Sequence, residues 1–258
     1  MRKLFVTDLD GTLLGENKTI TKDNYRQIEK LKASKHCFAI ATGRGYDLVE
    51  GIIKQYPMDV DYFILHNGAL IADKHGKIIK HEFISFKIVK AIIEGFYNED
   101  WKIHLGTGFK SFRFGDEGKI ANPYGVEIAT VEEIENEKIS MLGFSYKKND
   151  IIYVDNVCRE INSKFGYDVV AYRNVNYIDI VPKGCSKGDG VEYVKQREEI
   201  KQINTFAIGD SWNDVTMFDS VEHSFTFNKV EKELKTKARY IVDSVAECIE
   251  KYVLENAS

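Results

Sequence analysis

The chain has 258 residues, of which 43% are hydrophobic and 29% are charged, and only 3 are proline. This length and composition exclude a disordered or fibrous protein and predict one large globular domain or two small ones. The net charge of −4 combines 36 basic with 40 acidic residues, and no segment concentrates enough basic residues to follow a phosphate backbone. Nucleic acid is therefore not an expected partner.

The cysteines and the N-terminus indicate the cellular compartment in which the protein is expected. Cys37, Cys158, Cys185 and Cys248 are far apart and form no C-x-x-C pair, which predicts reduced, mostly buried thiols. The N-terminus does not have the pattern of a secretion signal, and no stretch approaches the roughly 20 apolar residues of a membrane span. We expect a cytoplasmic protein without a membrane partner, present as a monomer or a weak homo-oligomer.

The N-terminal part of the chain alternates predicted strands with predicted helices. Short apolar runs at 4–7, 37–41 and 62–65 are typical of strands buried on both faces, and a helical pattern begins near Thr21. The same order returns near the C-terminus, with a strand at 205–208 before a helical segment. This alternation predicts an α/β fold with a Rossmann-like parallel sheet.

The pattern changes in the middle of the chain. A helix with an apolar face at Val89, Ile92 and Ile93 precedes several short strands and a second helix near Val157 and Ile161. This arrangement predicts an α+β domain inserted into the first. We expect a discontinuous core of residues 1–81 and 184–258, and an insert of residues 82–183.

Acidic side chains follow two of the predicted core strands. Asp8 and Asp10 come after the first strand, and Asp210 comes after the strand at 205–208. Open parallel sheets bind ligands beyond the carboxyl ends of their strands, so these carboxylates are expected to meet in one crevice. Their mutual repulsion calls for a cation, and an all-oxygen donor set suits Mg²⁺. Lys187 begins another predicted helix, where a cation and free N–H groups favour an anion.

These residue types suit phosphoryl transfer. Asp8 is ionised at neutral pH with an ordinary pKa near 3.9, so it can attack phosphorus without a general base. Asp10 can protonate the leaving oxygen and later take a proton from the attacking water. Thr42, at the end of the second strand, offers a hydroxyl to phosphate oxygens.

Each signal also has an ordinary structural interpretation. Asp8 and Asp10 can form a turn, Asp210 and Asp214 can belong to a helix cap around Ser211, and a single lysine is usually a surface residue. Their joint occurrence in order, each at a strand end or helix start, favours the chemical interpretation.

Four segments together resemble the motifs of the haloacid dehalogenase superfamily. They are Asp8-Leu9-Asp10-Gly11-Thr12-Leu13-Leu14, Thr42-Gly43-Arg44, Lys187, and Gly209-Asp210-Ser211-Trp212-Asn213-Asp214. Asn67-Gly68-Ala69 and the inserted α+β segment narrow the resemblance to the Cof-type phosphatases, whose cap domain lies between the second and third motifs.

The resemblance implies a role for each of these residues. Asp8 is the nucleophile and a metal ligand, Asp10 is the general acid and base and a ligand through its backbone carbonyl, and Asp210 is the third ligand. The expected phosphate contacts are Thr42, Gly43, Lys187 and Asn213. The expected supporting residues are Asp214, Asn67 and Arg44.

The implied function is a Mg²⁺-dependent phosphatase of small phosphorylated metabolites, with sugar phosphates favoured, that works through an aspartyl-phosphate. Two alternatives remain open: a phosphotransferase or sugar phosphomutase on the same scaffold, and a phospho-ligand-binding protein without turnover. The chain departs from the family pattern at residues 224–229, which puts the pocket wall in doubt rather than the chemistry. The insert residues that could meet the substrate beyond its phosphate are Trp101, His104, Phe112, Arg113, Tyr172 and Arg173.

Overall fold

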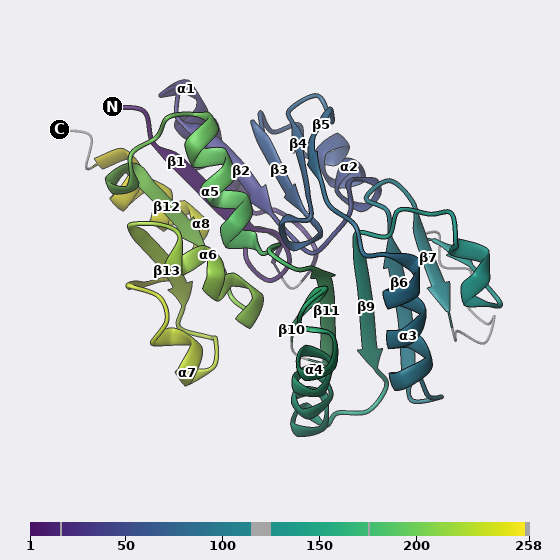
Figure 1. Cartoon of the computed structure of the whole chain (residues 1–258). Helices are drawn as coiled ribbons and strands as arrows, with labels where there is room; N and C mark the ends of the chain where they lie inside the picture. Colours follow the sequence, from purple (N-terminus) through teal and green to yellow (C-terminus); the bar gives the residue numbers. More distant parts are fainter. Residues whose placement is uncertain (16, 115–124, 175, 256–258) are drawn as a thin grey trace.

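The computed structural model describes residues 1–15, 17–114, 125–174 and 176–255. Two β-sheets occupy separate halves of the molecule, and the carboxyl ends of the parallel strands in the first sheet face the second sheet (Figure 1). In the described part of the chain, none of the helices combines the length and the apolar character needed to cross a membrane.

The first sheet has eight strands in the order β14-β13-β12-β1-β2-β3-β4-β5. The six strands from β14 to β3 are parallel, which confirms the predicted fold class, whereas β4 and β5 add an antiparallel hairpin at one edge. The strands span Leu4–Asp8 (β1), Cys37–Ala41 (β2), Tyr62–Leu65 (β3), Leu70–Asp73 (β4), Ile78–His81 (β5), Thr205–Ile208 (β12), His223–Phe227 (β13) and Tyr240–Val242 (β14).

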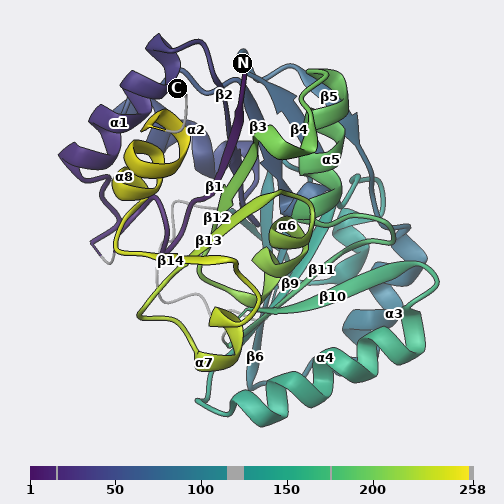
Figure 2. The same cartoon turned by 90° about the vertical axis from the view of Figure 1, so that its left-hand side faces the viewer.

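Helices cover both faces of this sheet, as Figure 2 shows. Alternate residues of β1 enter different cores: Leu4 and Val6 pack with α5 and α6, and Phe5 packs with α1 and α8. This alternation follows from the period of two in a strand and makes the sheet doubly wound. The helices span Lys22–Ala33 (α1), Tyr46–Gln55 (α2), Lys187–Arg197 (α5), Val215–Asp219 (α6), Lys232–Lys235 (α7) and Val245–Cys248 (α8).

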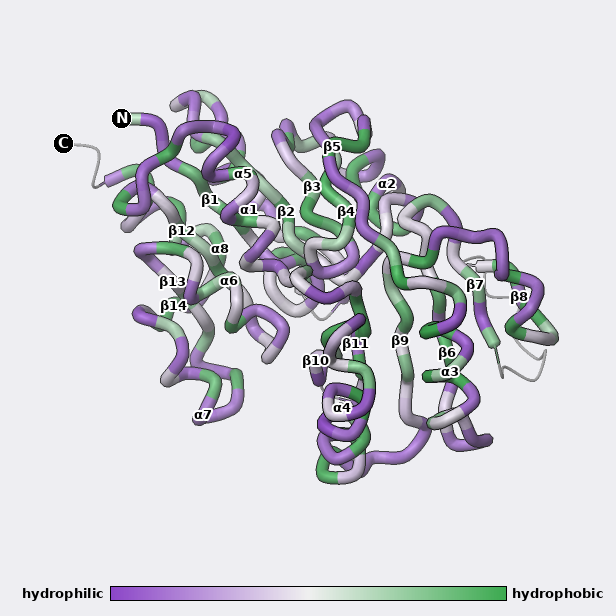
Figure 3. Tube along the Cα trace, viewed as in Figure 1, coloured by the Kyte–Doolittle hydropathy of each residue, from purple (hydrophilic) through white to green (hydrophobic). Residues whose placement is uncertain are grey.

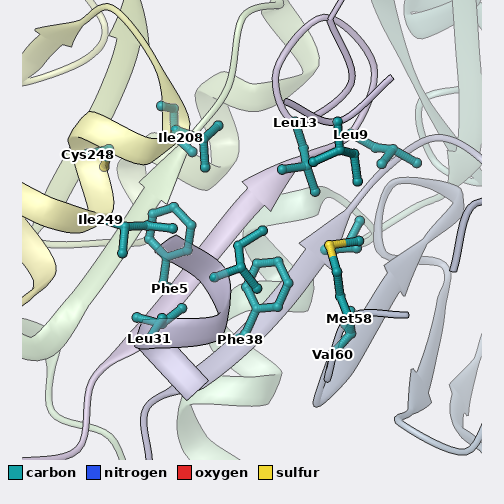
Figure 4. Close-up of a cluster of buried hydrophobic side chains, with 14 of the residues drawn as sticks. Phe5, Leu9, Leu13, Leu31, Phe38, Met58, Val60, Ile208, Cys248 and Ile249 are labelled. Atoms are coloured by element: carbon teal, nitrogen blue, oxygen red, sulfur yellow. The ribbon is translucent and has the colours of Figure 1, made fainter. Parts of the chain in front are cut away.

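The core on the α1 side extends to the first motif. Phe5 and Phe38 stack with ring centroids 6.2 Å apart, and Leu9 and Leu13 are fully buried in the same cluster (Figure 4). Leu9 stands between the two acidic residues of the motif. Its burial anchors the loop that follows β1 and so fixes where both carboxylates begin.

The second sheet has six strands in the order β10-β11-β9-β6-β7-β8. All neighbours are antiparallel except β7 and β8. Apolar side chains of the sheet pack against α3 and α4, and Figure 1 shows both helices on one face. These elements span Trp101–Gly106 (β6), Ser111–Phe114 (β7), Val126–Glu127 (β8), Met141–Tyr146 (β9), Val169–Asn174 (β10), Tyr177–Pro182 (β11), Phe86–Phe96 (α3) and Ile151–Phe165 (α4).

The first sheet uses residues 4–81 and 205–242, and the second uses residues 101–182. The first sheet has a hydrophobic cluster on each face and the second sheet has a separate cluster, and Figure 3 shows the hydrophobic stretches in the strands of both sheets. The predicted domain boundaries near residues 82 and 183 are consistent with this arrangement and stay a prediction. All four cysteines are free and buried.

Candidate active site

The predicted acidic residues meet at the carboxyl ends of the central strands. Asp8 is the last residue of β1, and Asp210 lies two residues beyond β12, the parallel neighbour of β1. Ligand oxygens of Asp8, Asp210 and Asp214 lie within 4.8 Å of one another. Neighbouring parallel strands thus bring residues about 200 positions apart into one carboxylate cluster.

Asp8 is buried, with 5% of its surface exposed. Burial, together with the negative charges of Asp214 and Asp210, raises the pKa of Asp8, while Lys187 opposes this shift. Lys187 Nζ donates to Asp8 Oδ1 at 2.6 Å. One cation therefore compensates part of the charge of this cluster.

Lys187 is the first residue of α5, whose N-cap is Ser186, and only 1% of it is exposed. Its Nζ also lies 2.6 Å from Asp214 Oδ1. Burial lowers the pKa of Lys187, but the charges of Asp214 and Asp8 outweigh this effect and hold the pKa above its usual value. The structure thus makes Lys187 a permanent buried cation and not the surface lysine of the ordinary interpretation.

Asp214 orders the loop after β12. Its Oδ2 accepts from the backbone N–H groups of Asp210 at 2.8 Å and Ser211 at 2.9 Å. Ser211 and Asp214 form a capping box on the short 3₁₀ helix Trp212–Asp214. The helix-cap interpretation and the chemical one are therefore compatible, because the same side chain caps the helix and holds Lys187.

Gly11 leaves the space that the Asp210 carboxylate fills. A Cβ on Gly11 would lie 2.3 Å from Asp210 Oδ2, and the φ of Gly11 is +85°. Thr12 Oγ1 donates to Asp210 Oδ1 at 2.5 Å. Burial and the charge of Asp214 raise the pKa of Asp210. The two loops that carry the acidic motifs are thus in direct contact.

The carboxylate of Asp10 turns toward cations and not toward the cluster. Arg44 donates to both of its oxygens, from Nε at 2.6 Å and from Nη2 at 2.6 Å, and Lys18 Nζ donates at 2.9 Å. Burial opposes the shift, but the hydrogen bonds and charges of Arg44 and Lys18 lower the pKa of Asp10. Asp10 is therefore ionised in this arrangement, and the guanidinium of Arg44, the residue after Thr42-Gly43, binds both of its oxygens.

Polar side chains from three loops border the cluster. Thr42 Oγ1 accepts from the backbone N–H of Arg44 at 3.1 Å, and the backbone N–H of Asn67 donates to Thr42 O at 3.0 Å. Asn67 has the left-handed φ of 47°, and its Oδ1 accepts from Asn213 Nδ2 at 3.3 Å. Hydrogen bonds therefore join Thr42, Asn67 and Asn213, while Lys187, another of the predicted phosphate contacts, lies against Asp8.

Asp179, on β11, is a site residue that the sequence did not reveal. It is buried, with 6% exposed, and its Oδ2 accepts from Asn67 Nδ2 at 3.0 Å. A Cβ on Gly43 would lie 3.3 Å from the same oxygen. Burial raises the pKa of Asp179, whereas the hydrogen bond from Asn67 and the charge of Lys187 lower it. The second sheet thus reaches directly into the site.

Some of the insert residues expected near the substrate lie in the hydrophobic cluster of the second sheet, and others lie on its opposite face. Trp101 and Phe112 belong to its hydrophobic cluster. The remaining residues, apart from Arg173, occupy one cross-strand row together with Asp179. The row runs Arg113, His104, Gly143, Asp179, Tyr172, and opposite residues in such a sheet point to the same face. A polar face that includes Asp179 is therefore turned toward the site.

Arg173 belongs to a contact between the two sheets and not to this row. Its guanidinium carbon lies 5.7 Å from the ring centroid of Trp212, and Trp212 Nε1 donates to Glu231 Oε2 at 3.0 Å. The next residue, Asn174, accepts from Ser211 Oγ at 2.9 Å. These contacts hold the end of β10 against the loop after β12.

The chemistry of the donor set fits a hard divalent cation. Burial and mutual repulsion raise the pKa values of Asp8 and Asp210, which is what carboxylates do when their charge is incompletely balanced. All the side-chain donors of the cluster are oxygen atoms. Asp214 already accepts three hydrogen bonds, which leaves Asp8 and Asp210 as the better side-chain ligands.

A doubly wound core, a second sheet over its ligand-binding edge, and a lysine beside a buried aspartate suit an enzyme of phosphoryl transfer. A family model described as haloacid dehalogenase-like hydrolase matches residues 5–249 of the chain. The chain belongs to this family. The membership confirms the predicted class, a phosphoric monoester hydrolase of the haloacid dehalogenase superfamily with a Cof-type arrangement.

Individual proteins resemble the chain over nearly its whole length. It is 28% identical to a Streptococcus pyogenes protein named as a phosphatase, with 98% of each chain covered. It is 24% identical to the Bacillus subtilis 5-amino-6-(5-phospho-D-ribitylamino)uracil phosphatase YitU, over 84% of this chain and 83% of that protein. A solved structure of a subclass IIB sugar phosphatase of the superfamily superposes with a TM-score of 0.77 at 19% identity, over 95% of each chain.

Proposed function

We propose that the protein is a Mg²⁺-dependent phosphatase of small phosphorylated metabolites and that Asp8 forms an aspartyl-phosphate. The observation that carries the proposal is the placement of Asp8: it is buried beside Lys187, within a carboxylate cluster at the edge of the sheet where ligands bind. A nucleophile, a fixed cation and an all-oxygen cluster at one point are what phosphoryl transfer requires.

Asp8 attacks phosphorus, and the bond between phosphorus and the ester oxygen breaks. Asp10 gives its proton to the leaving oxygen, so the alcohol departs neutral. Water then attacks the phosphorus of the aspartyl-phosphate while Asp10 takes its proton back, which releases inorganic phosphate and restores Asp8. Asp10 must leave Arg44 and take up a proton from solvent before the first step, because the ion-paired carboxylate of this structure holds no proton to donate.

Asp8, Asp210 and the backbone carbonyl of Asp10 are the proposed ligands of Mg²⁺. When bound, the ion neutralises charge on the phosphoryl oxygens and on the carboxylates. Gly11 supports this assignment, because its lack of a Cβ leaves room for the Asp210 carboxylate.

The proposed phosphate contacts are Thr42, Gly43, Lys187 and Asn213, with Asp214, Asn67 and Arg44 in support. Asp214 supports Lys187 through a direct ion pair, and Asn67 supports Asn213 through its side-chain oxygen. A phosphoryl group attached to Asp8 would therefore meet a buried ammonium and amide N–H groups, which stabilise negative charge in a water-poor site.

Sugar and polyol phosphates are the favoured substrates. The polar row on the second sheet presents donors and acceptors at the side of the site where a hydroxylated leaving group would lie. The relative from Bacillus subtilis is named for a substrate that carries a phosphorylated ribityl chain. The proposal also places the enzyme in the cytoplasm, which agrees with four free and buried cysteines.

The test is phosphate release from a panel of phosphorylated metabolites, with and without Mg²⁺, for wild type, Asp8→Asn and the exposed control Asp168→Asn. We expect Mg²⁺-dependent release by wild type and the control, and a loss of several orders of magnitude in Asp8→Asn. Exchanged phosphosugar in place of free phosphate would indicate a phosphotransferase. Ligand binding without any turnover would indicate a binding protein and would contradict the proposal.

A further inference from the structure

A chain of side-chain hydrogen bonds leaves the loop after β12, passes through the second sheet and returns to the same loop. Ser211 Oγ donates to Asn174 Oδ1 at 2.9 Å, and the Asn174 side chain is hydrogen bonded to Asp179. From the other side, Asn213 Nδ2 donates to Asn67 Oδ1 at 3.3 Å, and Asn67 Nδ2 donates to Asp179 Oδ2 at 3.0 Å. Both ends of the path lie in the motif around Asp210, and its midpoint is Asp179.

The Asp179 carboxylate determines which atom donates and which atom accepts in every hydrogen bond of this path. The Asp179 carboxylate accepts from both neighbouring amides, whereas an amide presents a donor on one side and an acceptor on the other. Asn67 must therefore turn its NH₂ group to Asp179 and its oxygen to Asn213. Asn213 must in turn use one N–H on Asn67, and its second N–H is left for a ligand.

The burial of the path makes a reversed amide costly. Asn67 is 1% exposed, Asn213 is 4% exposed and Asp179 is 6% exposed, so water cannot easily replace a lost partner. Asn213 Oδ1 is buried and has no hydrogen-bond partner among the described residues. This amide thus has one fixed bond, to Asn67, and its second N–H is available to donate to the phosphate site.

We propose that Asp179 is a positioning residue that fixes the orientation of the Asn213 amide for phosphate binding. This inference rests on the proposed function and deepens it. Asp179 belongs to the second sheet, while Asn67 and Asn213 belong to loops of the first. The phosphate site is therefore fully oriented only when the second sheet lies against the first, which couples that contact to phosphate affinity.

The first test compares Asp179→Asn with wild type, with inorganic phosphate as the probe. An asparagine at this position brings an NH₂ group into a place where two donors already converge, so one amide of the path has to turn. We expect the competitive inhibition constant of inorganic phosphate and the KM for acetyl phosphate to rise about tenfold, the loss of one charge-assisted hydrogen bond. The control Asp168→Asn removes an exposed carboxylate from the loop before β10 and is expected to change both values less than twofold.

The second test exchanges the two side chains. In the double variant Asp179→Asn with Asn67→Asp, Asn174 can donate to the new amide oxygen, the new NH₂ group can donate to the carboxylate at position 67, and Asn213 can donate to the same carboxylate. Every bond is restored with no change in net charge. We expect the double variant to bind inorganic phosphate within about threefold of wild type, and each single variant to be weaker than the double.

If Asp179 had a structural role alone, the losses in phosphate binding from the two substitutions would add, and the double variant would bind phosphate most weakly. That result, or a double variant that does not fold, overturns the inference, as does a phosphate inhibition constant unchanged in Asp179→Asn. A variant Asp179→Asn that does not fold supports the inference only when the double variant folds and binds phosphate. A wild type that neither binds phosphate nor releases it contradicts the proposed function itself.

Discussion

Lys187 Nζ lies 2.6 Å from Asp8 Oδ1, which joins the start of α5 to the end of β1 across 179 positions of sequence. The same nitrogen contacts Asp214 Oδ1, so one buried cation is shared by two buried carboxylates. This triad is both a structural element and the centre of the proposed chemistry. Its removal is therefore expected to affect stability and activity together.

Replacing Lys187 with Met leaves two buried carboxylates without their cation. We expect the free energy of unfolding to fall by about 3–5 kcal/mol, because breaking a buried ion pair leaves an uncompensated charge. Urea denaturation measures this loss, and phosphate release is expected to disappear in parallel. Lys54→Met removes an exposed lysine of α2 that pairs at the surface with Glu50, and is expected to cost less than about 1 kcal/mol. A Lys187→Met protein as stable as wild type would contradict this account of the triad.

Asp10→Asn is expected to separate the two half-reactions. With p-nitrophenyl phosphate, whose leaving group needs no proton, one equivalent of nitrophenolate should appear in a burst, followed by slow hydrolysis of the aspartyl-phosphate. With an alkyl phosphate the first step also needs the proton, so both the burst and turnover should fall by about 10²–10⁴. Rapid-quench kinetics distinguishes these outcomes. Equal turnover of the alkyl ester by wild type and Asp10→Asn would exclude Asp10 as the general acid.

The contact between Gly11 and Asp210 predicts a metal-binding defect in Gly11→Ala. The new Cβ would lie 2.3 Å from the Asp210 oxygen, in a backbone conformation that alanine rarely adopts. We expect the Mg²⁺ concentration for half-maximal activity, and the Mg²⁺ dissociation constant from calorimetry, to rise at least about tenfold, since a displaced ligand costs more than 1.4 kcal/mol. Gly51→Ala, in α2 and with nothing within 4 Å, is the control. It is expected to leave Mg²⁺ binding unchanged, and an unchanged value in Gly11→Ala too would remove Gly11 from the site.

Several of these relationships follow from the sequence. The apolar runs predicted β2 and β3 at the residues where they occur, and the parallel order brought Asp8 and Asp210 to one edge of the sheet. This succeeded because a strand buried on both faces has a continuous apolar signal that ends abruptly at a polar residue. The burial of Lys187 could not be deduced from its neighbours in sequence, since it depends on the carboxylates around it.

Asp179 shows why the rest of the site could not be predicted. In the sequence it is one polar residue in an alternating strand, which is indistinguishable from a solvent-facing position. Its burial results from the contact of the second sheet with Asn67, a tertiary relationship without a local pattern. The β4–β5 hairpin was not predicted either, because the short apolar run after Asn67-Gly68 does not by itself distinguish a strand from a buried helical segment.

His66 predicts a pH dependence of stability. It is buried, its Nδ1 lies 2.7 Å from Ser140 Oγ of the second sheet half, and burial, together with His81, lowers its pKa to about 3. The unfolded chain has the ordinary histidine pKa of about 6.5. Between about pH 3 and pH 6.5, position 66 is therefore protonated in the unfolded chain and neutral in the folded protein. Stability is therefore fully present above pH 6.5 and decreases as the pH falls toward 3.

A glutamine at position 66 has no proton to gain in this range. Below pH 6, the free energy of unfolding of wild type should fall with pH more steeply than that of His66→Gln, by about 1.4 kcal/mol per pH unit. Urea denaturation at several pH values between 4 and 7.5 measures the two slopes. Parallel slopes would show that His66 titrates in the folded state as it does in the unfolded chain.

The central claim is that Asp8 becomes covalently phosphorylated during turnover. The most direct measurement is mass spectrometry of acid-quenched enzyme after mixing with substrate and Mg²⁺, with Asp10→Asn used to slow breakdown of the intermediate. We expect a phosphoryl group on the peptide that contains Asp8, and on that residue alone. A phosphoryl group on another residue, or full turnover by Asp8→Asn, would contradict it.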